Sequence, residues 1–76
     1  MSNKRIQAQQ KEFQIAVGKK VRAVRLKTGM GYTPFAAMIP MRAEAYRRIE
    51  KGYAAPHITT LKQIADTLGV DIKDFL

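Results

Sequence analysis

The positions of glycine and proline constrain the fold of this chain more than any other feature of its sequence. Gly29, Pro40, Gly52 and Gly69 each follow a segment with helical apolar spacing. Glycine readily adopts the left-handed conformation that ends helices, and the residue before a proline is pushed out of the helical region. No segment shows the apolar–polar alternation of a credible β-strand. The sequence therefore predicts an all-α fold of five short helical segments.

The first predicted helix runs from about residue 9 to residue 28. Its apolar residues recur at intervals of three and four and form one face: Phe13, Val17, Val21 and Val24. Residues 1–8 are polar and show no such pattern. We therefore expect a mobile basic arm over residues 1–8 and one domain over residues 9–76.

Three further α-helices are predicted at about 33–39, 42–51 and 59–68. The first of them is expected to be capped by Thr33 and to hold Pro34 in its first turn, where a proline removes no intrahelical hydrogen bond. A last short helix is expected after Asp71, whose side chain can cap it. Around the 59–68 segment the predicted inner face consists of Ile58, Leu61, Ile64, Ala65 and Leu68.

Length and composition exclude several classes of protein. A chain of 76 residues forms one modest core with little room for an enzyme-sized cavity. It has no cysteine, and its single histidine, His57, has no second ligand type nearby. We therefore expect no enzyme, no metal and no cofactor, and a loop or helix-cap position for His57. No apolar run approaches the ~18 residues of a membrane span, so a cytoplasmic protein is expected.

The positive charge of the chain is concentrated in its first two thirds. The net charge is +8, from 14 Lys and Arg against six Asp and Glu. Residues 1–51 hold 12 of the basic residues and three of the acidic ones, whereas residues 52–76 hold two and three. A one-sided basic surface favours a polyphosphate partner, because each neutralised phosphate releases a condensed counterion. A basic protein with no polyanion partner is the alternative.

Several separated motifs run through the chain without a gap. They are Val21-Arg22-x-x-Arg25 before Gly29-Met30, then Phe35-Ala36-x-x-Ile39, Ile49-Glu50-Lys51-Gly52, Pro56, and Leu61-x-x-Ile64-Ala65-x-x-Leu68-Gly69-Val70. Together they resemble the helix-turn-helix family of lambda-type phage repressors, Cro and related bacterial (XRE-like) regulators, over about residues 17–76. The resemblance implies a compact five-helix lambda-repressor-like domain that binds double-stranded DNA. Its recognition helix would be residues 42–51, in the major groove.

Carried over by position, the resemblance implies four base-contacting residues. Arg47 or Arg48 would pair with a guanine, Glu44 would accept a hydrogen bond from a cytosine amino group, and Ala43 would touch a thymine methyl group. Tyr46 and Ile49 would face the core instead. A solvated helical face is the alternative for the two arginines.

The same resemblance implies a set of phosphate contacts, which position the protein without selecting a sequence. They are Lys19, Arg22, Arg25, Tyr32, Arg42, Lys51 and Tyr53, together with Lys4 and Arg5 of the arm. For Tyr53 an ordinary surface position is an equal alternative. In relatives the residues matching Arg25 and Glu50 form a pair that ties the first helix to the recognition helix, so we expect that pair here.

The sequence departs from the family pattern in three places. Gly31 and Tyr32 replace the usual small polar cap and the glutamine after it, so the amide contact to DNA is lost. Pro40 occupies a turn position commonly filled by glycine, and proline cannot adopt a positive φ. Arg42 replaces the usual Ser or Thr before the recognition helix. The sequence therefore predicts a divergent member of the family.

The leading functional hypothesis is a homodimeric regulator, most simply a repressor, on bacterial or phage DNA in the nucleoid. Ile72, Phe75 and Leu76 are candidates for its dimer patch, with packing into the monomer core as the alternative. A second hypothesis is a protein-interaction module, such as an antitoxin that holds a toxin or an antirepressor. A third is non-specific nucleoid or RNA binding, which predicts equal affinity for scrambled duplexes.

Overall fold

The computed structural model describes the backbone of residues 2–76 and the side chains of residues 8–76. That part contains no strand and four α-helices: α1 (Ser2–Thr28), α2 (Tyr32–Met38), α3 (Ala43–Glu50) and α4 (Ile58–Leu68). The predicted all-α class is confirmed. None of these helices is both long enough and apolar enough to cross a lipid bilayer.

The fifth predicted helix is only a single 3-10 turn, η1 (Ile72–Phe75). The Asp74 and Leu76 amides bond to carbonyls three residues earlier, at 2.9 and 3.1 Å. Four residues are too few to establish the i to i−4 bonding of an α-helix. Asp71 caps the turn as predicted, because its side chain accepts a hydrogen bond from the Lys73 amide at 2.9 Å.

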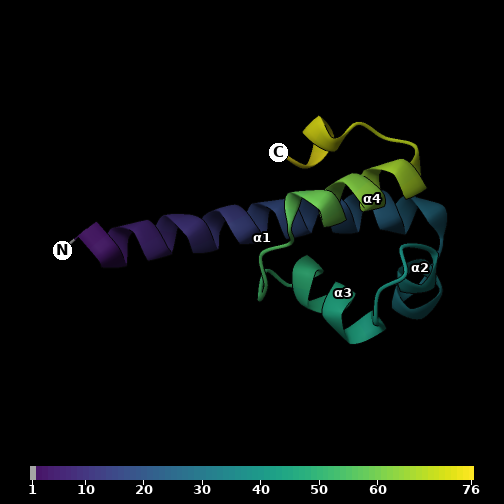
Figure 1. Cartoon of the computed structure of the whole chain (residues 1–76), viewed down its shortest axis with the longest axis horizontal. Coiled ribbons are helices and arrows are strands. Elements are labelled where there is room, and N and C mark those ends of the chain that lie inside the picture. The colour runs from purple at the N-terminus through teal and green to yellow at the C-terminus, as the bar shows by residue number, and fades with distance from the viewer. Residues whose placement is uncertain (1) are drawn as a thin grey trace.

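Helix α1 begins at Ser2 rather than near residue 9. No glycine or proline precedes Gly18, and the glutamine, alanine and lysine residues there are good helix formers. No residue in this stretch therefore prevents the helix from extending toward the N-terminus. In Figure 1 its first half projects past the other helices, along the 42 Å long axis of the molecule. Of the basic arm predicted over residues 1–8, residues 2–8 belong to this helix, and the side chains of Lys4 and Arg5 lie outside the described residues.

The core lies where α1 packs between α4 on one side and the α2–α3 pair on the other (Figure 1). Its buried apolar side chains are Val17, Val21, Phe35, Ala36, Ile39, Tyr46, Leu61, Ile64, Ala65 and Phe75. Phe75 is fully buried, so it packs into the monomer and is not part of a surface patch, while Leu76 is 53% exposed.

Two residues predicted for the inner faces are exposed instead. Phe13 is 56% exposed, because it lies one turn before Val17, where α1 leaves the packed helices. Ile58 is 62% exposed and is the first residue of α4. His57 precedes it at the N-cap position, without a side-chain capping bond.

The connection between α2 and α3 accommodates Pro40 without a positive φ. The Met41 amide donates to the Ala36 carbonyl at 2.9 Å, which closes the turn around the proline. Among the described residues, positive φ occurs only at Gly29, Gly52 and Gly69. Helix α2 starts at Tyr32, with Gly31 in the N-cap position, so the predicted Thr33 cap is wrong; Pro34 lies in the first turn as predicted.

Gly18 permits the closest approach between α1 and the end of α3. A Cβ atom at this position would lie 2.5 Å from the Ile49 carbonyl oxygen and 2.6 Å from that of Glu50. Both are backbone atoms at the C-terminus of a helix, so neither can rotate away. A glycine inside a helical pattern often marks such a contact, and here it sets the position of α3.

Replacing Gly18 with alanine is expected to destabilise the fold by about 1–3 kcal/mol, because overpacking exceeds the gain in helix propensity. Urea denaturation measures the change. Gly31→Ala is the control, since nothing lies within 4 Å of the added Cβ atom and φ is −80°. A Gly18→Ala variant as stable as the wild type would contradict the described packing.

Candidate nucleic-acid interface

Helix α3 separates its residues sharply into a buried and an exposed face. Tyr46, Ile49 and Glu50 are buried against α1 and α2. The exposed positions are Glu44, Ala45 and Arg48 in the helix and the cap residues Arg42 and Lys51, with Arg47 half-buried. Ala43 is also half-buried and packs against the core. The structure therefore brings the predicted base-contacting residues together on one outward face, apart from Ala43, which is turned partly inward.

A buried ion pair joins α1 to the end of α3. The Arg25 Nε atom donates to Glu50 Oε2 at 2.6 Å, and its Nη2 atom donates to Oε1 at 3.0 Å. The two side chains are 6% and 1% exposed. This bidentate geometry satisfies both carboxylate oxygens, which a buried charge requires.

Aromatic side chains extend this pair into α2. The Tyr46 hydroxyl donates a hydrogen bond to Glu50, and the Tyr46 ring packs against Phe35 with centroids 5.0 Å apart. The Arg25 guanidinium lies over the Tyr32 ring, 4.5 Å from its centroid, and its Nη1 atom donates to the Met30 carbonyl at 2.6 Å. Tyr32, although outside the family pattern, thus covers the ion pair.

The electrostatics of the network follow from this burial. Burial raises the pKa of the Tyr46 hydroxyl, and its hydrogen bond to the Glu50 carboxylate raises it further. The hydrogen bond from Arg25 to Glu50 raises the pKa of the guanidinium. Both shifts favour a neutral Tyr46 and a charged Arg25 in the network.

The phosphate contact predicted for Arg25 does not fit this arrangement. All three of its guanidinium-group nitrogens donate to Glu50 or Met30, and its side chain is almost completely buried. An arginine in this state has little surface left for DNA.

Glu44 and Arg47 lie next to each other on the outward face of α3. The Arg47 Nη1 atom is 3.6 Å from Glu44 Oε1, one turn away, and the side chains are 43% and 70% exposed. Exposed pairs of this kind contribute at most about 1 kcal/mol to stability, so both groups are available to a ligand.

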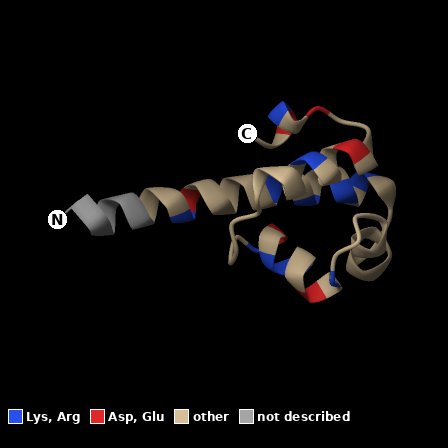
Figure 2. Cartoon of the chain, in the orientation of Figure 1, with Lys and Arg blue, Asp and Glu red and all other residues tan. Residues whose placement is uncertain are grey.

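The basic side chains after residue 51 lie close to acidic ones, whereas several basic side chains at α3 do not. Lys62 and Lys73 are close to Asp66 and Asp71, at 2.6 and 4.0 Å. Arg42, Arg48 and Lys51 form no ion pair with any described residue and carry their full positive charge at the surface of α3. Figure 2 shows residues of both charges on α3 and on the α4 and η1 side, whereas α1 is mostly basic.

Helix α1 and the loop after α3 hold the other predicted phosphate contacts. Lys19 and Arg22 are exposed on α1, and Arg22 lies one turn after Gly18. Tyr53 is 57% exposed, with the Lys11 ammonium 5.5 Å from its ring centroid. Among the described residues, no group of His, Asp and Glu could hold a metal ion.

Two contacts of the interface were not anticipated from the sequence. The hydroxyl of Tyr46 bonds to Glu50 four residues later, a spacing that brings side chains together on a helix and was a usable signal. Lys11 Nζ donates to the Gly52 carbonyl at 2.9 Å and so places a cation just beyond the C-terminal end of α3. These residues are 41 positions apart, and no local pattern indicates the contact.

Comparison with known proteins agrees with this geometry. A family model described as helix-turn-helix (HTH_3) matches residues 21–75. The crystal structure of the restriction-modification controller protein C.AhdI from Aeromonas hydrophila superposes with a TM-score of 0.82. The match covers 87% of this chain and 96% of that one, at 14% sequence identity, and so shows a shared fold. No curated protein matches the chain.

The Tyr46→Phe variant tests the buried network. Removing the hydroxyl that donates to Glu50 is expected to cost about 1–3 kcal/mol of stability, measured by urea denaturation. Because the folded-state pKa of Tyr46 is raised, its contribution is present at neutral pH and is lost as the pH rises above about 10, where the unfolded tyrosine ionises. The variant is therefore expected to lose stability less steeply above that pH.

Tyr53→Phe is the matched control, because it removes an exposed hydroxyl. We expect it to change stability by less than about 0.5 kcal/mol and to keep the wild-type pH dependence. Equal effects of the two substitutions would show that the Tyr46–Glu50 bond does not stabilise the fold.

Proposed function

Because the chain belongs to the helix-turn-helix family of XRE-like regulators, we propose that it is a DNA-binding transcriptional regulator that binds specific duplex sequences with α3 in the major groove. The observation that carries the proposal is the outward face of α3. It combines exposed cations, Arg42, Arg48 and Lys51, with the Glu44–Arg47 pair, on a helix whose other face is anchored to the core.

Roles on this face follow from position and charge. Arg48 and Arg47 are assigned to base contacts, since a guanidinium can pair with both acceptors on a guanine edge. Arg42 and Lys51, at the two ends of α3, are assigned to phosphates, with Arg22 and Lys19 contributing from α1. Arg25 and Tyr32 are assigned to holding α3, and Ala43 to at most an edge contact with a thymine methyl group.

A single helix of this length contacts few base pairs, so we propose that the active form is a homodimer. Two copies related by a two-fold axis would bind half-sites about 34 Å apart on one side of the duplex. Repression is the proposed mode of action, since it requires only that the bound dimer exclude other proteins from the site.

Selection of bound duplexes from a random pool tests the proposed function. The expected result is one enriched, two-fold symmetric site, bound at least about 10³-fold more tightly than its scrambled version in an anisotropy titration. No binding to any duplex at about 50 mM salt would contradict the proposal, and equal affinity for scrambled duplexes would indicate non-specific binding instead.

Arg48→Ala and Lys51→Ala are expected to affect the selected duplex differently. Arg48→Ala is expected to cost about 1–3 kcal/mol and to relax the preference at one base position. Lys51→Ala is expected to weaken binding to all duplexes alike and to lower the slope of log affinity against log salt by about 1. Anisotropy titrations at several salt concentrations separate the two. Unchanged base preference in Arg48→Ala would refute its assignment.

Glu44→Gln tests whether the acidic residue on the DNA-facing side contributes selectivity. A carboxylate near phosphates opposes binding unless it accepts a hydrogen bond from a base or holds Arg47 toward one. The variant is therefore expected to bind scrambled duplexes up to about tenfold more tightly and to discriminate less. Glu12→Gln, an exposed site on α1, makes the same change in net charge. Equal effects of both variants would show that only net charge matters.

A further inference from the structure

One face of the first half of α1 contacts the end of α3 and the loop after it, residues 51–57. Lys11, Ile15 and Gly18 are four and three residues apart, so they share this face of the helix. Gly18 meets the end of α3, and the other two residues meet the loop. The match to the helix-turn-helix family begins only at residue 21, so Lys11 and Ile15 lie outside the part of the chain that it covers. The family pattern therefore assigns them no role.

Two contacts from this face hold Gly52 at the start of the loop. The Lys11 ammonium group donates a hydrogen bond to the Gly52 carbonyl at 2.9 Å. Gly52 has a φ of +75°, and a Cβ atom there would lie 2.7 Å from the Cγ1 atom of Ile15 and 2.9 Å from its Cα atom. The backbone of the loop therefore rests directly on α1, and only glycine permits this approach.

The same ammonium group lies over the aromatic ring of the next residue. Its Nζ atom is 5.5 Å from the centroid of the Tyr53 ring, within the range of a cation–π interaction. Tyr53 is 57% exposed, and its backbone amide donates to the Arg48 carbonyl at 2.9 Å. Lys11 thus binds a segment whose backbone is hydrogen-bonded to Arg48, a residue assigned to a base contact.

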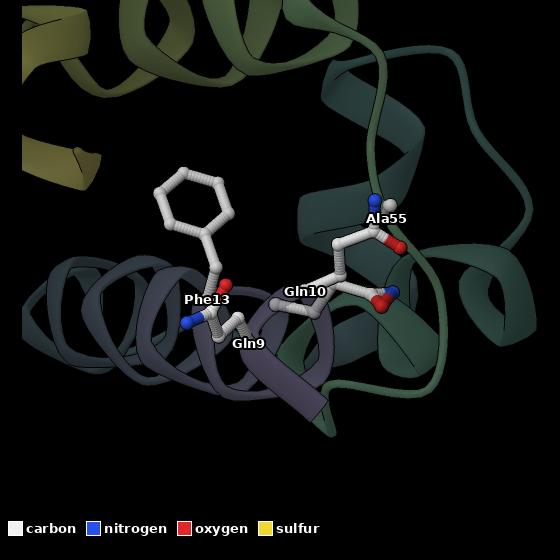
Figure 3. Close-up of a pocket in the computed structure, with 5 residues that line it drawn as sticks. Gln9, Gln10, Phe13 and Ala55 are labelled. Atoms are coloured by element: carbon white, nitrogen blue, oxygen red, sulfur yellow. The ribbon is translucent and has the colours of Figure 1, made fainter. Parts of the chain in front are cut away.

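Further along the loop, at Ala55, the packing against α1 is more open. A groove of about 500 Å³ lies there, lined by Gln9, Gln10, Phe13, Gln14 and Ala55. Figure 3 shows Phe13 and Gln10 projecting from α1, with Ala55 beside Gln10. An open groove gives few close contacts, so the start of the loop is fixed to α1 chiefly through Lys11 and Ile15.

We propose that Lys11 is a positioning residue for DNA binding: its ammonium group fixes Gly52 and Tyr53 against α1 and so holds Tyr53 ready to contact a phosphate. A side chain that is held in place before binding loses less conformational entropy when the contact forms. Lys11 acts through the loop and not as a phosphate contact of its own. The inference rests on the proposed DNA-binding function and adds to it a residue from outside the family match.

Amide hydrogen exchange of the full chain tests the first step without DNA. Lys11→Met keeps a long side chain and removes the ammonium group. The Tyr53 amide is expected to exchange at least about fivefold faster in this variant, because the loop opens more often. Lys11→Arg, which can again donate to the carbonyl, is expected to restore the protection. Lys27→Met, an exposed position on the same helix with the same loss of charge, is the control and is expected to leave the exchange unchanged. Unchanged exchange in Lys11→Met would overturn the proposal.

A double-mutant cycle on the selected duplex tests the second step. Lys11→Met and Tyr53→Phe are each expected to weaken binding about fivefold in an anisotropy titration. The double variant is also expected to lose about fivefold, because residues that act as a unit are not additive. Lys27→Met combined with Tyr53→Phe is the control cycle, in which the two effects are expected to multiply. The slope of log affinity against log salt is expected to change by less than about 0.3 in Lys11→Met.

Two results of the cycle would overturn the proposal. They are a loss of about 25-fold in the double variant and a salt slope lowered by about 1 in Lys11→Met, since Lys11 would then act on DNA independently of Tyr53. Either result leaves the proposed function intact. A wild type that binds no duplex would overturn the proposed function itself, and the role of Lys11 in it, whatever the hydrogen exchange shows.

Discussion

The buried pair between Arg25 and Glu50 is the interaction on which the rest of the structure depends. It joins the last turn of α1 to the last residue of α3, and Tyr46 and Tyr32 enclose it from two sides. Two buried charges gain little net stability over an apolar pair, yet removal of either one leaves the other unpaired, at a cost of about 3–5 kcal/mol. The pair therefore fixes the position of α3 more than it increases the stability of the fold.

The glycine and proline residues that end helices made most of the fold predictable from the sequence. Gly29, Pro40, Gly52 and Gly69 do lie at the ends of the observed helices, because their effect is local. The extension of α1 to Ser2 was not predicted, since no apolar repeat marks a helical stretch that has no core to face. The exposure of Phe13 and Ile58 was missed for the same reason: periodicity shows which face a residue is on, but not where the neighbouring helix ends.

The candidate site was partly predictable as well. The resemblance to the helix-turn-helix family implied the division of α3 into a core face with Tyr46 and Ile49 and an outward face with Arg48, and the burial of these residues agrees with it. The burial of Arg25, which leaves it little surface for a phosphate, could not be predicted from the sequence. It results from its three-dimensional contacts to Glu50 and the Met30 carbonyl. The distribution of charge was also only partly predictable from the sequence. The sequence places the excess positive charge in residues 1–51, and the structure adds that the C-terminal lysines are close to aspartates.

The central claim is that α3 is the DNA-binding helix. An NMR titration of the isotopically labelled protein with its selected duplex tests it most directly, because the titration reports on each backbone amide separately. The account predicts that the largest chemical-shift changes fall in α3, with smaller changes at the exposed cations of α1 and little change in η1 and the second half of α4. Changes concentrated in α4 and η1, with α3 unaffected, would contradict the assignment of α3 as the DNA-binding helix.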